Sequence, residues 1–243
     1  MDLRFVKGDI TNVVADAIVL PANEKLKEGS GTSAAIFKKA GRKELTMACK
    51  GIGKCKVGSA VPTLAYGISA RYIIHAVVPK WIDGEHNEYE TLCSAYLSAL
   101  EIANKLKCES VAFPLLASGN NGFDKELAIK IAKEAVGQYQ SEVVTDVMIM
   151  VYDDNSQVSV ALCGYEISDE VCDTEVMTER KIQMEAFKKT LFEGRDAAVD
   201  MTMKAMAMAI DWIKDEENQN KMLNVACSIV GAIIMNKLPK KDK

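Results

Sequence analysis

The stretch that runs from AIVLPAN (residues 17–23) through EGSGTS (28–33) to AAIFKKA (34–40) decides the fold of this chain. The continuous apolar run at 17–20 is typical of a short strand that is covered on both faces. Small residues dominate the loop at 28–33, so another group has room to approach its backbone. The last segment indicates a helix that ends at Gly41. We therefore predict a strand, a small-residue loop and a helix in this order.

The start of this helix is a candidate anion site. Thr32 and Ser33 are residue types that commonly cap helices, so we expect the unpaired backbone N–H groups of the first turn to point into the loop. Free amides, the positive end of the helix dipole and the lack of bulky side chains suit a diphosphate. An ordinary strand–loop–helix connection is the alternative on this stretch alone. The loop is neither a Walker A loop nor a GxGxxG fingerprint.

The overall composition is that of a globular protein with a proper core, since 49% of the 243 residues are hydrophobic and 26% are charged. The net charge of −4 supplies no general basic field, which disfavours nucleic-acid binding. Seven cysteines without a CxxC pair predict reduced thiols, a cytoplasmic location and no metal site. We expect no signal peptide and no membrane span, because the longest late apolar stretch, 222–235, is short and interrupted.

Strand-like and helix-like segments alternate along the first part of the chain. The strand-like segments are 3–6, 17–20, 59–63, 72–78, 110–116 and 146–152, and the helix-like segments are 34–40, 42–50, 88–107 and 125–139. This alternation predicts an α/β fold with a largely parallel sheet, in which Pro62 marks an edge strand. Ligands of such sheets bind beyond the carboxyl ends of the strands. The loops at 28–33 and 117–124 both follow such strands, so both are candidate ligand loops.

The composition changes after about residue 165. Four of the five prolines and thirteen of the fifteen glycines precede this point, whereas eight of the twelve methionines follow it. The segments 178–194, 196–215 and 218–237 have helical patterns. Methionine and alanine at helical spacing are typical of an adaptable core or of a helix–helix interface. We predict a domain at 1–165 and an all-α extension at 166–243 that binds a partner protein or forms a homo-oligomer.

Further motifs stand in a fixed order around the first loop: GDIT (8–11), PAN (21–23), RYIIHAVVP (71–79) and VAFPLLASGNNGF (111–123). This order resembles the macrodomain family, whose usual blocks are GDIT, DAIVNAAN, GGGVD, KYVIHTVGP and SIAFPxxSxGxxGF/Y. The resemblance covers about residues 1–165. It implies a three-layer α/β/α domain with a mixed, mostly parallel central sheet. The implied ligand is ADP-ribose or an ADP-ribosylated protein, with no cofactor required.

The resemblance also implies a role for individual residues. Asp9, with the Ile10 backbone beside it, would accept a hydrogen bond from the adenine amine; a turn aspartate is the alternative. Asn23 would bind the distal ribose or, alternatively, satisfy the backbone of its own loop. Phe123 would pack on that ribose unless it is a core aromatic, and Tyr152 would pack against adenine. Backbone amides of two loops would hold the diphosphate: Gly29, Ser30, Gly31, Thr32 and Ser33 from one, and Ser118, Gly119, Asn120, Asn121 and Gly122 from the other.

One block departs from the family pattern. Members that hydrolyse ADP-ribose linkages generally carry an aspartate in GGGVDGAI, where this chain has Ser33 followed by Ala34. A serine hydroxyl is no general base near neutral pH without an activating partner. Two functions therefore stay open. The chain is either a weak hydrolase acting on ADP-ribosylated protein or O-acetyl-ADP-ribose, with Asn23 and Ser33 as candidate catalytic residues, or a non-catalytic reader. We expect His75 to be a core residue.

Overall fold

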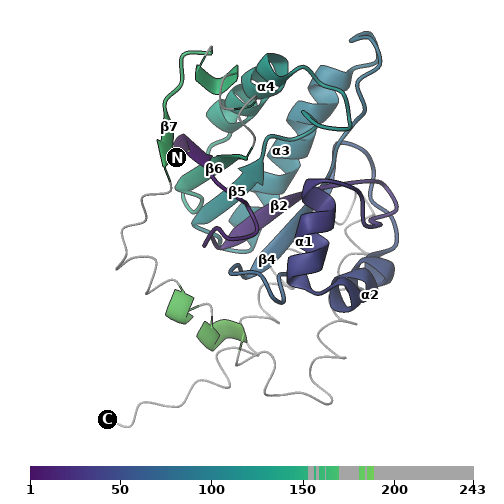
Figure 1. The fold of residues 1–243 in the computed structure, drawn as a ribbon, viewed down its shortest axis with the longest axis vertical. Helices are drawn as coiled ribbons and strands as arrows, with labels where there is room; N and C mark the ends of the chain where they lie inside the picture. Colours follow the sequence, from purple (N-terminus) through teal and green to yellow (C-terminus); the bar gives the residue numbers. More distant parts are fainter. Residues whose placement is uncertain (153–155, 157–158, 162, 170–180, 184, 189–243) are drawn as a thin grey trace. The chain divides into compact units, whose positions relative to one another are not determined.

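The computed structural model describes residues 1–152, 156, 159–161, 163–169, 181–183 and 185–188 (Figure 1). The chain divides into two compact units, Met1–Lys189 and Thr190–Lys243, and the second lies outside the described residues. The elements of the first unit, in chain order, are β1 (Asp2–Lys7), β2 (Ala17–Ala22), α1 (Thr32–Ala40), α2 (Arg42–Ile52), β3 (Ala60–Leu64), β4 (Tyr72–Val77), α3 (Glu88–Lys105), β5 (Ser110–Pro114), α4 (Lys125–Gln138), β6 (Asp146–Val151) and β7 (Ile167–Asp169).

The strands form one seven-stranded sheet in the order β3-β4-β2-β5-β6-β1-β7. β3 is antiparallel to β4, and the other neighbours are parallel, so the sheet is mixed and mostly parallel, as predicted. Parallel register pairs Leu20 with His75 across β2 and β4. Pro62 lies in β3, which is an edge strand as its sequence predicts.

Helices cover both faces of this sheet. Every residue of β4 and β5 is buried, which requires cover on both sides. α1 packs against α2 and β2, whereas α3 packs against α4 and β4 (Figure 1). The connections β2–β4 and β4–β5 run in opposite directions along the sheet, so right-handed crossovers place α1 and α2 on one face and α3 on the other. The domain therefore has the α/β/α layers that we expected.

A half-buried ion pair ties together the starts of three strands. Arg71, just before β4, lies 3.0 Å from Asp16, which precedes β2. The other oxygen of Asp16, Oδ2, accepts hydrogen bonds from the backbone N–H groups of Glu109 and Ser110, at the start of β5. These contacts fix the amino end of the sheet, opposite the edge at which the parallel strands end.

Two expectations about the later part of the chain need comment. Ile167–Asp169 forms β7 and pairs with β1, so the sheet takes in three residues that we had assigned to the all-α extension. Of the predicted helix 178–194, residues 181–183 and 185–188 are described, and they are helical. The predicted helices 196–215 and 218–237 lie outside the described residues. Among the described residues, no helix combines the length and the hydropathy needed to cross a membrane.

Candidate functional site

The residues expected to bind a ligand gather at one edge of the sheet, because the parallel strands all end there. In sheet order, β4 leads to Trp81, β2 to Asn23 and loop 28–33, β5 to loop 118–123, β6 to Tyr152 and β1 to Asp9. The strand order therefore places Asn23 on the β2 side of the second loop and Asp9 on the β1 side. An elongated ligand along this edge would meet a side-chain amide, two amide-rich loops and an acidic residue.

The first loop ends in a helix terminus that no side chain caps. α1 begins at Thr32, and Gly31 occupies the N-cap position with φ +58°. This corrects our expectation that Thr32 or Ser33 caps a helix that begins at 34. Among the described residues, no side chain accepts a hydrogen bond from the first turn, and that turn contains no acidic residue. α4 differs, because the Asp124 side chain accepts from the amides of Glu126 and Leu127. Of these two helices, only α1 presents free amides to an anion.

Ser33 has a local partner. It is 4% exposed, and its Oγ accepts a hydrogen bond of 3.0 Å from the backbone N–H of Gly29. The Ser33 hydroxyl therefore closes the loop on itself. No carboxylate or imidazole is among the hydrogen-bond partners that the described part of the chain gives this hydroxyl, so nothing there would activate it as a base or a nucleophile.

The two small-residue loops meet. The Asn120 Nδ2 donates a hydrogen bond of 2.6 Å to the Ser30 Oγ, which joins the exposed tips of both loops. At Gly119 an added Cβ would meet no heavy atom within 4 Å, so the backbone there faces open space. Ala117 starts the second loop with φ +62°, a left-handed conformation that costs a non-glycine residue about 1–2 kcal/mol. The surrounding fold thus holds the second loop in a fixed shape.

Asn23 organises its own loop. Its Oδ1 accepts hydrogen bonds from the backbone N–H groups of Lys25 and Lys27, and its Nδ2 donates to the Lys27 carbonyl at 2.7 Å. Both acceptor positions of the amide oxygen are therefore occupied. One N–H of the side chain is left over, because an amide carries two. Asn23 is exposed, so this N–H is available to a ligand hydroxyl.

At the other end of the edge, Asp9 forms a turn. Its Oδ1 accepts from the backbone N–H of Thr11 at 2.9 Å, so the turn alternative holds for that oxygen. Among the described residues, the other oxygen, Oδ2, accepts no hydrogen bond and can receive a ligand amine. Ile10 is buried, whereas the ring of Tyr152 is 76% exposed just beyond β6. An exposed aromatic ring beside a free carboxylate oxygen suits a purine base.

Phe123 lies beside an aromatic residue that our sequence reasoning missed. Phe123 is 3% exposed, and its ring meets that of Trp81 edge to face at 5.1 Å. The backbone N–H of Trp81 donates to the Asn121 carbonyl, and the Asn121 Nδ2 donates to the Pro79 carbonyl. Trp81 follows the end of β4, so the rule that ligands bind at carboxyl ends of strands could have identified it.

Glu88 was also missed. It is the first residue of α3 and is only 3% exposed, and its carboxylate accepts four backbone N–H groups of segment 82–86. Burial by itself would raise the pKa of Glu88, but these hydrogen bonds outweigh it and lower the pKa to about 2. Asp83 and His86 place donor atoms within 4.8 Å of this carboxylate. Because the backbone amides already occupy both Glu88 oxygens, we assign the group to loop structure.

His75 and Cys49 are core residues. His75 is fully buried in β4, and its Nε2 lies 2.9 Å from the Thr63 Oγ1. Burial lowers the pKa of His75 to about 3 and raises that of the Cys49 thiol to about 12. Neither side chain is in its charged form at neutral pH. The expectation that His75 belongs to the core is confirmed.

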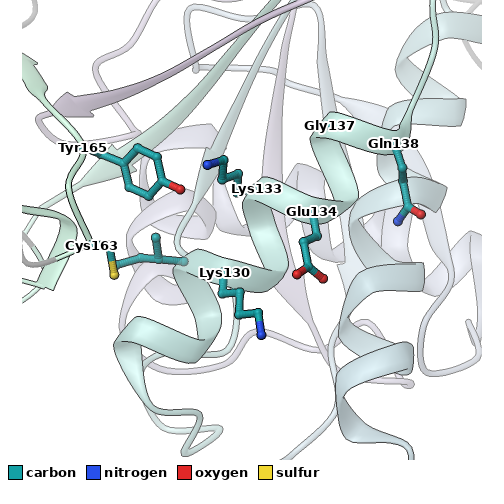
Figure 2. Close-up of a pocket in the computed structure, with 8 residues that line it drawn as sticks. Lys130, Lys133, Glu134, Gly137, Gln138, Cys163 and Tyr165 are labelled. Atoms are coloured by element: carbon teal, nitrogen blue, oxygen red, sulfur yellow. The ribbon is translucent and has the colours of Figure 1, made fainter.

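A hollow of about 770 Å³ lies on the outer face of α4, away from the loops (Figure 2). Its lining includes Lys130, Lys133, Glu134, Cys163 and Tyr165, and the Lys133 ammonium lies 4.7 Å from the centre of the Tyr165 ring. Burial, Glu126 and Asp124 raise the pKa of the Cys163 thiol, which disfavours its reactive thiolate form. The hollow contains none of the residues expected to bind a ligand.

Comparison with known proteins agrees with this geometry. The family model described as Macro domain matches residues 19–132. Macro domain-containing protein lmo2759 of Listeria monocytogenes is 43% identical over 145 residues, which are 58% of this chain and 82% of that protein. An Escherichia fergusonii protein named O-acetyl-ADP-ribose deacetylase is 40% identical over 141 residues, 56% of this chain and 79% of its own.

A solved structure has the same fold. It is a mutant Oceanobacillus iheyensis macrodomain with ADPR, and it superimposes with a TM-score of 0.62 at 27% identity. The match covers 66% of this chain and 90% of that one.

Proposed function

Because this chain belongs to the macro domain family, we propose that it binds ADP-ribose along the edge formed by the carboxyl ends of its parallel strands. The observation that carries the proposal is the uncapped N-terminus of α1, which faces an open glycine loop across the Ser30–Asn120 hydrogen bond. A diphosphate between these loops would accept backbone N–H groups from both sides.

We place the remaining parts of the ligand according to the order of the strands. Adenine lies at the β1 and β6 end, where the Asp9 Oδ2 accepts from its amine and the exposed Tyr152 ring covers its face. The distal ribose lies at the β2 and β4 end, beside the free N–H of Asn23 and the edge of Phe123. Each group thereby meets a side chain of matching chemistry.

Slow hydrolysis is the second candidate activity. The Escherichia fergusonii relative named O-acetyl-ADP-ribose deacetylase favours it, and the ligand class would be an ADP-ribosylated protein or O-acetyl-ADP-ribose. Ser33 supplies no base, because its hydroxyl accepts the hydrogen bond of the Gly29 backbone N–H. Asn23 would orient the ribose while a bound water attacks. Without a positioned base we expect a rate lower by about 10²–10⁴ than that of members that have one.

A non-catalytic reader is the alternative. Binding then needs only the loops, Asp9 and the distal ribose contacts, all of which this chain provides. Residues 166–243 would then connect ADP-ribose binding to a partner protein or to a second copy of the chain. The methionine-rich composition of that region supports an interaction role.

Calorimetric titration with ADP-ribose, ADP and AMP tests binding. We expect ADP-ribose to bind most tightly, since it reaches every contact along the edge. In Asp9→Asn the Thr11 turn can persist while the charge that accepts the adenine amine is lost, so affinity for all three ligands should fall. If Asp9→Asn binds as the parent does, the assignment of adenine is wrong.

Incubation with mono-ADP-ribosylated protein and with O-acetyl-ADP-ribose then separates the two functions. Loss of the modification from parent protein, but not from a variant that no longer binds ADP-ribose, would establish hydrolysis. Binding without any turnover would establish the reader. Ser33→Ala should leave any turnover rate per bound complex unchanged, because we assign its hydroxyl to the loop.

A further inference from the structure

Segment 81–86 connects the end of β4 to α3, and a single buried carboxylate holds it. The Glu88 Oε1 accepts the backbone N–H groups of Ile82, Asp83 and Gly84 at 3.1–3.2 Å, and its Oε2 accepts that of His86 at 2.6 Å. Glu88 is 3% exposed, whereas residues 82–87 are exposed. The side chain therefore organises a surface segment from beneath.

Trp81 transmits this arrangement to the loop after β5. Its ring packs on that of Phe123 with 5.1 Å between the ring centres, and its backbone N–H donates a hydrogen bond of 2.8 Å to the Asn121 carbonyl. On its other side the ring meets Gly84, where an added Cβ would lie 3.0 Å from the Trp81 Cη2. Because Glu88 holds the Gly84 amide, it fixes the backbone against which Trp81 rests.

The contact with Phe123 lies at the end of the edge formed by β2 and β4, where we place the distal ribose. A loosened Trp81 would let Phe123 and Asn121 shift. Adenine would be spared, because its contacts come from loops that follow β1 and β6, and the diphosphate would keep the backbone amides at the start of α1, which follows β2. The consequence of loosening should thus fall on one part of the ligand.

We propose that Glu88 is a positioning residue for the distal ribose, acting through Trp81 and Phe123. This inference rests on the proposed binding of ADP-ribose. Glu88 touches no ligand atom in this arrangement; it sets the position of the half-buried Trp81 and, through it, of Phe123 beside the proposed ribose.

The test compares Glu88→Gln with Asp16→Asn. Each substitution removes the charge from a carboxylate that accepts backbone N–H groups, but Asp16 lies at the opposite end of the sheet. The glutamine presents an N–H₂ group to at least one backbone donor, which breaks that contact. Calorimetric affinities for ADP-ribose and for ADP, which lacks the distal ribose, are measured for the parent and both variants.

We expect Glu88→Gln to weaken ADP-ribose binding by about tenfold or more and ADP binding by less than about twofold, a difference that general destabilisation would not produce. Asp16→Asn should change neither affinity. Equal losses for the two ligands, or no loss for either, would overturn the proposal. If the parent protein fails to bind ADP-ribose, the proposed function is wrong. The fluorescence measurement below then still tests whether Glu88 positions Trp81.

The fluorescence of Trp81 reports how tightly its ring is packed. The chain has two tryptophans, so Trp212→Phe leaves Trp81 as the single fluorophore. In that background Glu88→Gln should increase acrylamide quenching of Trp81, and Asp16→Asn should not. Unchanged quenching would contradict positioning whether or not a ligand binds.

Trp81→Ala provides a second test of the proposal if the Glu88 variant fails to fold. Because Trp81 is only half-buried, its removal should leave the core intact. It should reproduce the selective loss of ADP-ribose affinity. The double variant Glu88→Gln/Trp81→Ala should lose little more than either single variant, since the two act in series. Additive losses would show that Glu88 does not act through Trp81.

Discussion

Gly119 and His75 show how single residues set function and stability in different ways. Gly119 borders open space in the second loop, so a side chain there can be accommodated without displacing the fold. His75 has no such room, because it is fully buried beside Thr63 and Cys49. A change at Gly119 should therefore alter ligand binding alone, whereas a change at His75 should alter the free energy of unfolding.

Gly119→Glu should abolish ADP-ribose binding, with a loss of at least about 100-fold in affinity, because it places a carboxylate against the proposed diphosphate. The melting temperature should match that of the parent, since an added Cβ meets no neighbour. Titration calorimetry and thermal unfolding check the two halves of this prediction. Gly119→Ala is the matched control and should retain binding. Tight binding by Gly119→Glu would move the diphosphate elsewhere.

His75 should make the protein less stable in mild acid. Its folded pKa is lowered to about 3 by burial, so the folded state takes no proton at His75 as pH falls through its ordinary value of 6.5. The unfolded state does take a proton at His75. The stability that the neutral His75 contributes is therefore complete well above pH 6.5 and falls by about 1.4 kcal/mol by pH 5.5. The loss continues until pH approaches the folded pKa.

Urea unfolding between pH 7.5 and 5.5 measures this dependence. His86 works in the opposite direction, because its hydrogen bond to Asp83 raises its pKa. We therefore compare the parent with His75→Asn, which keeps His86 and can still bond to Thr63. The variant should show a shallower loss of stability with falling pH. Identical slopes would mean that His75 is protonated in the fold.

At the scale of elements, the site depends on which helix ends are capped. α4 satisfies its first amides with Asp124, and α1 leaves its own open toward the neighbouring loop. The open end alone would be an ordinary helix terminus. We expect it to bind an anion because β2 and β5 are adjacent parallel strands whose following loops meet. Pairing of the strands thus brings the two loops together, and the missing cap leaves the backbone amides of α1 free.

The Ser30–Asn120 hydrogen bond should hold a bound ligand in place. Ser30→Ala and Asn120→Ala each remove it, and a neutral hydrogen bond contributes about 0.5–1.5 kcal/mol, so ADP-ribose should dissociate roughly two- to tenfold faster. Stopped-flow displacement measures the rate. The double variant should dissociate no faster than the single ones. Additive effects would show that the two side chains contact the ligand separately.

At the scale of the whole molecule, the site lies within one compact unit, Met1–Lys189. β7 and the described helical residues up to 188 belong to this unit, which therefore extends past the composition change at about 165. Every residue that we assign to ADP-ribose binding precedes residue 153. Binding should accordingly be independent of Thr190–Lys243.

A fragment of residues 1–189 should bind ADP-ribose with an affinity within about twofold of the full chain. Any self-association of the full chain, measured by analytical ultracentrifugation, should be lost in the fragment, because we assign interaction to the methionine-rich region. A fragment of residues 1–165 is the informative comparison, since it lacks β7, which pairs with β1 beside the proposed adenine site. Equal stability of the two fragments would support our original boundary at 165.

Sequence alone determined the family and most of the elements, because hydrophobic periodicity, glycines and ordered motifs are local properties of the chain, whereas β7 depended on its pairing with β1. AIVL at 17–20 predicts a buried strand whatever it pairs with, and Pro62 predicts an edge. Only the tertiary structure decided the partners of polar side chains. Ser33 bonds to Gly29, and Glu88 collects four amides of a preceding segment. Hydrogen bonds depend on distances that folding sets, so no periodic pattern records them.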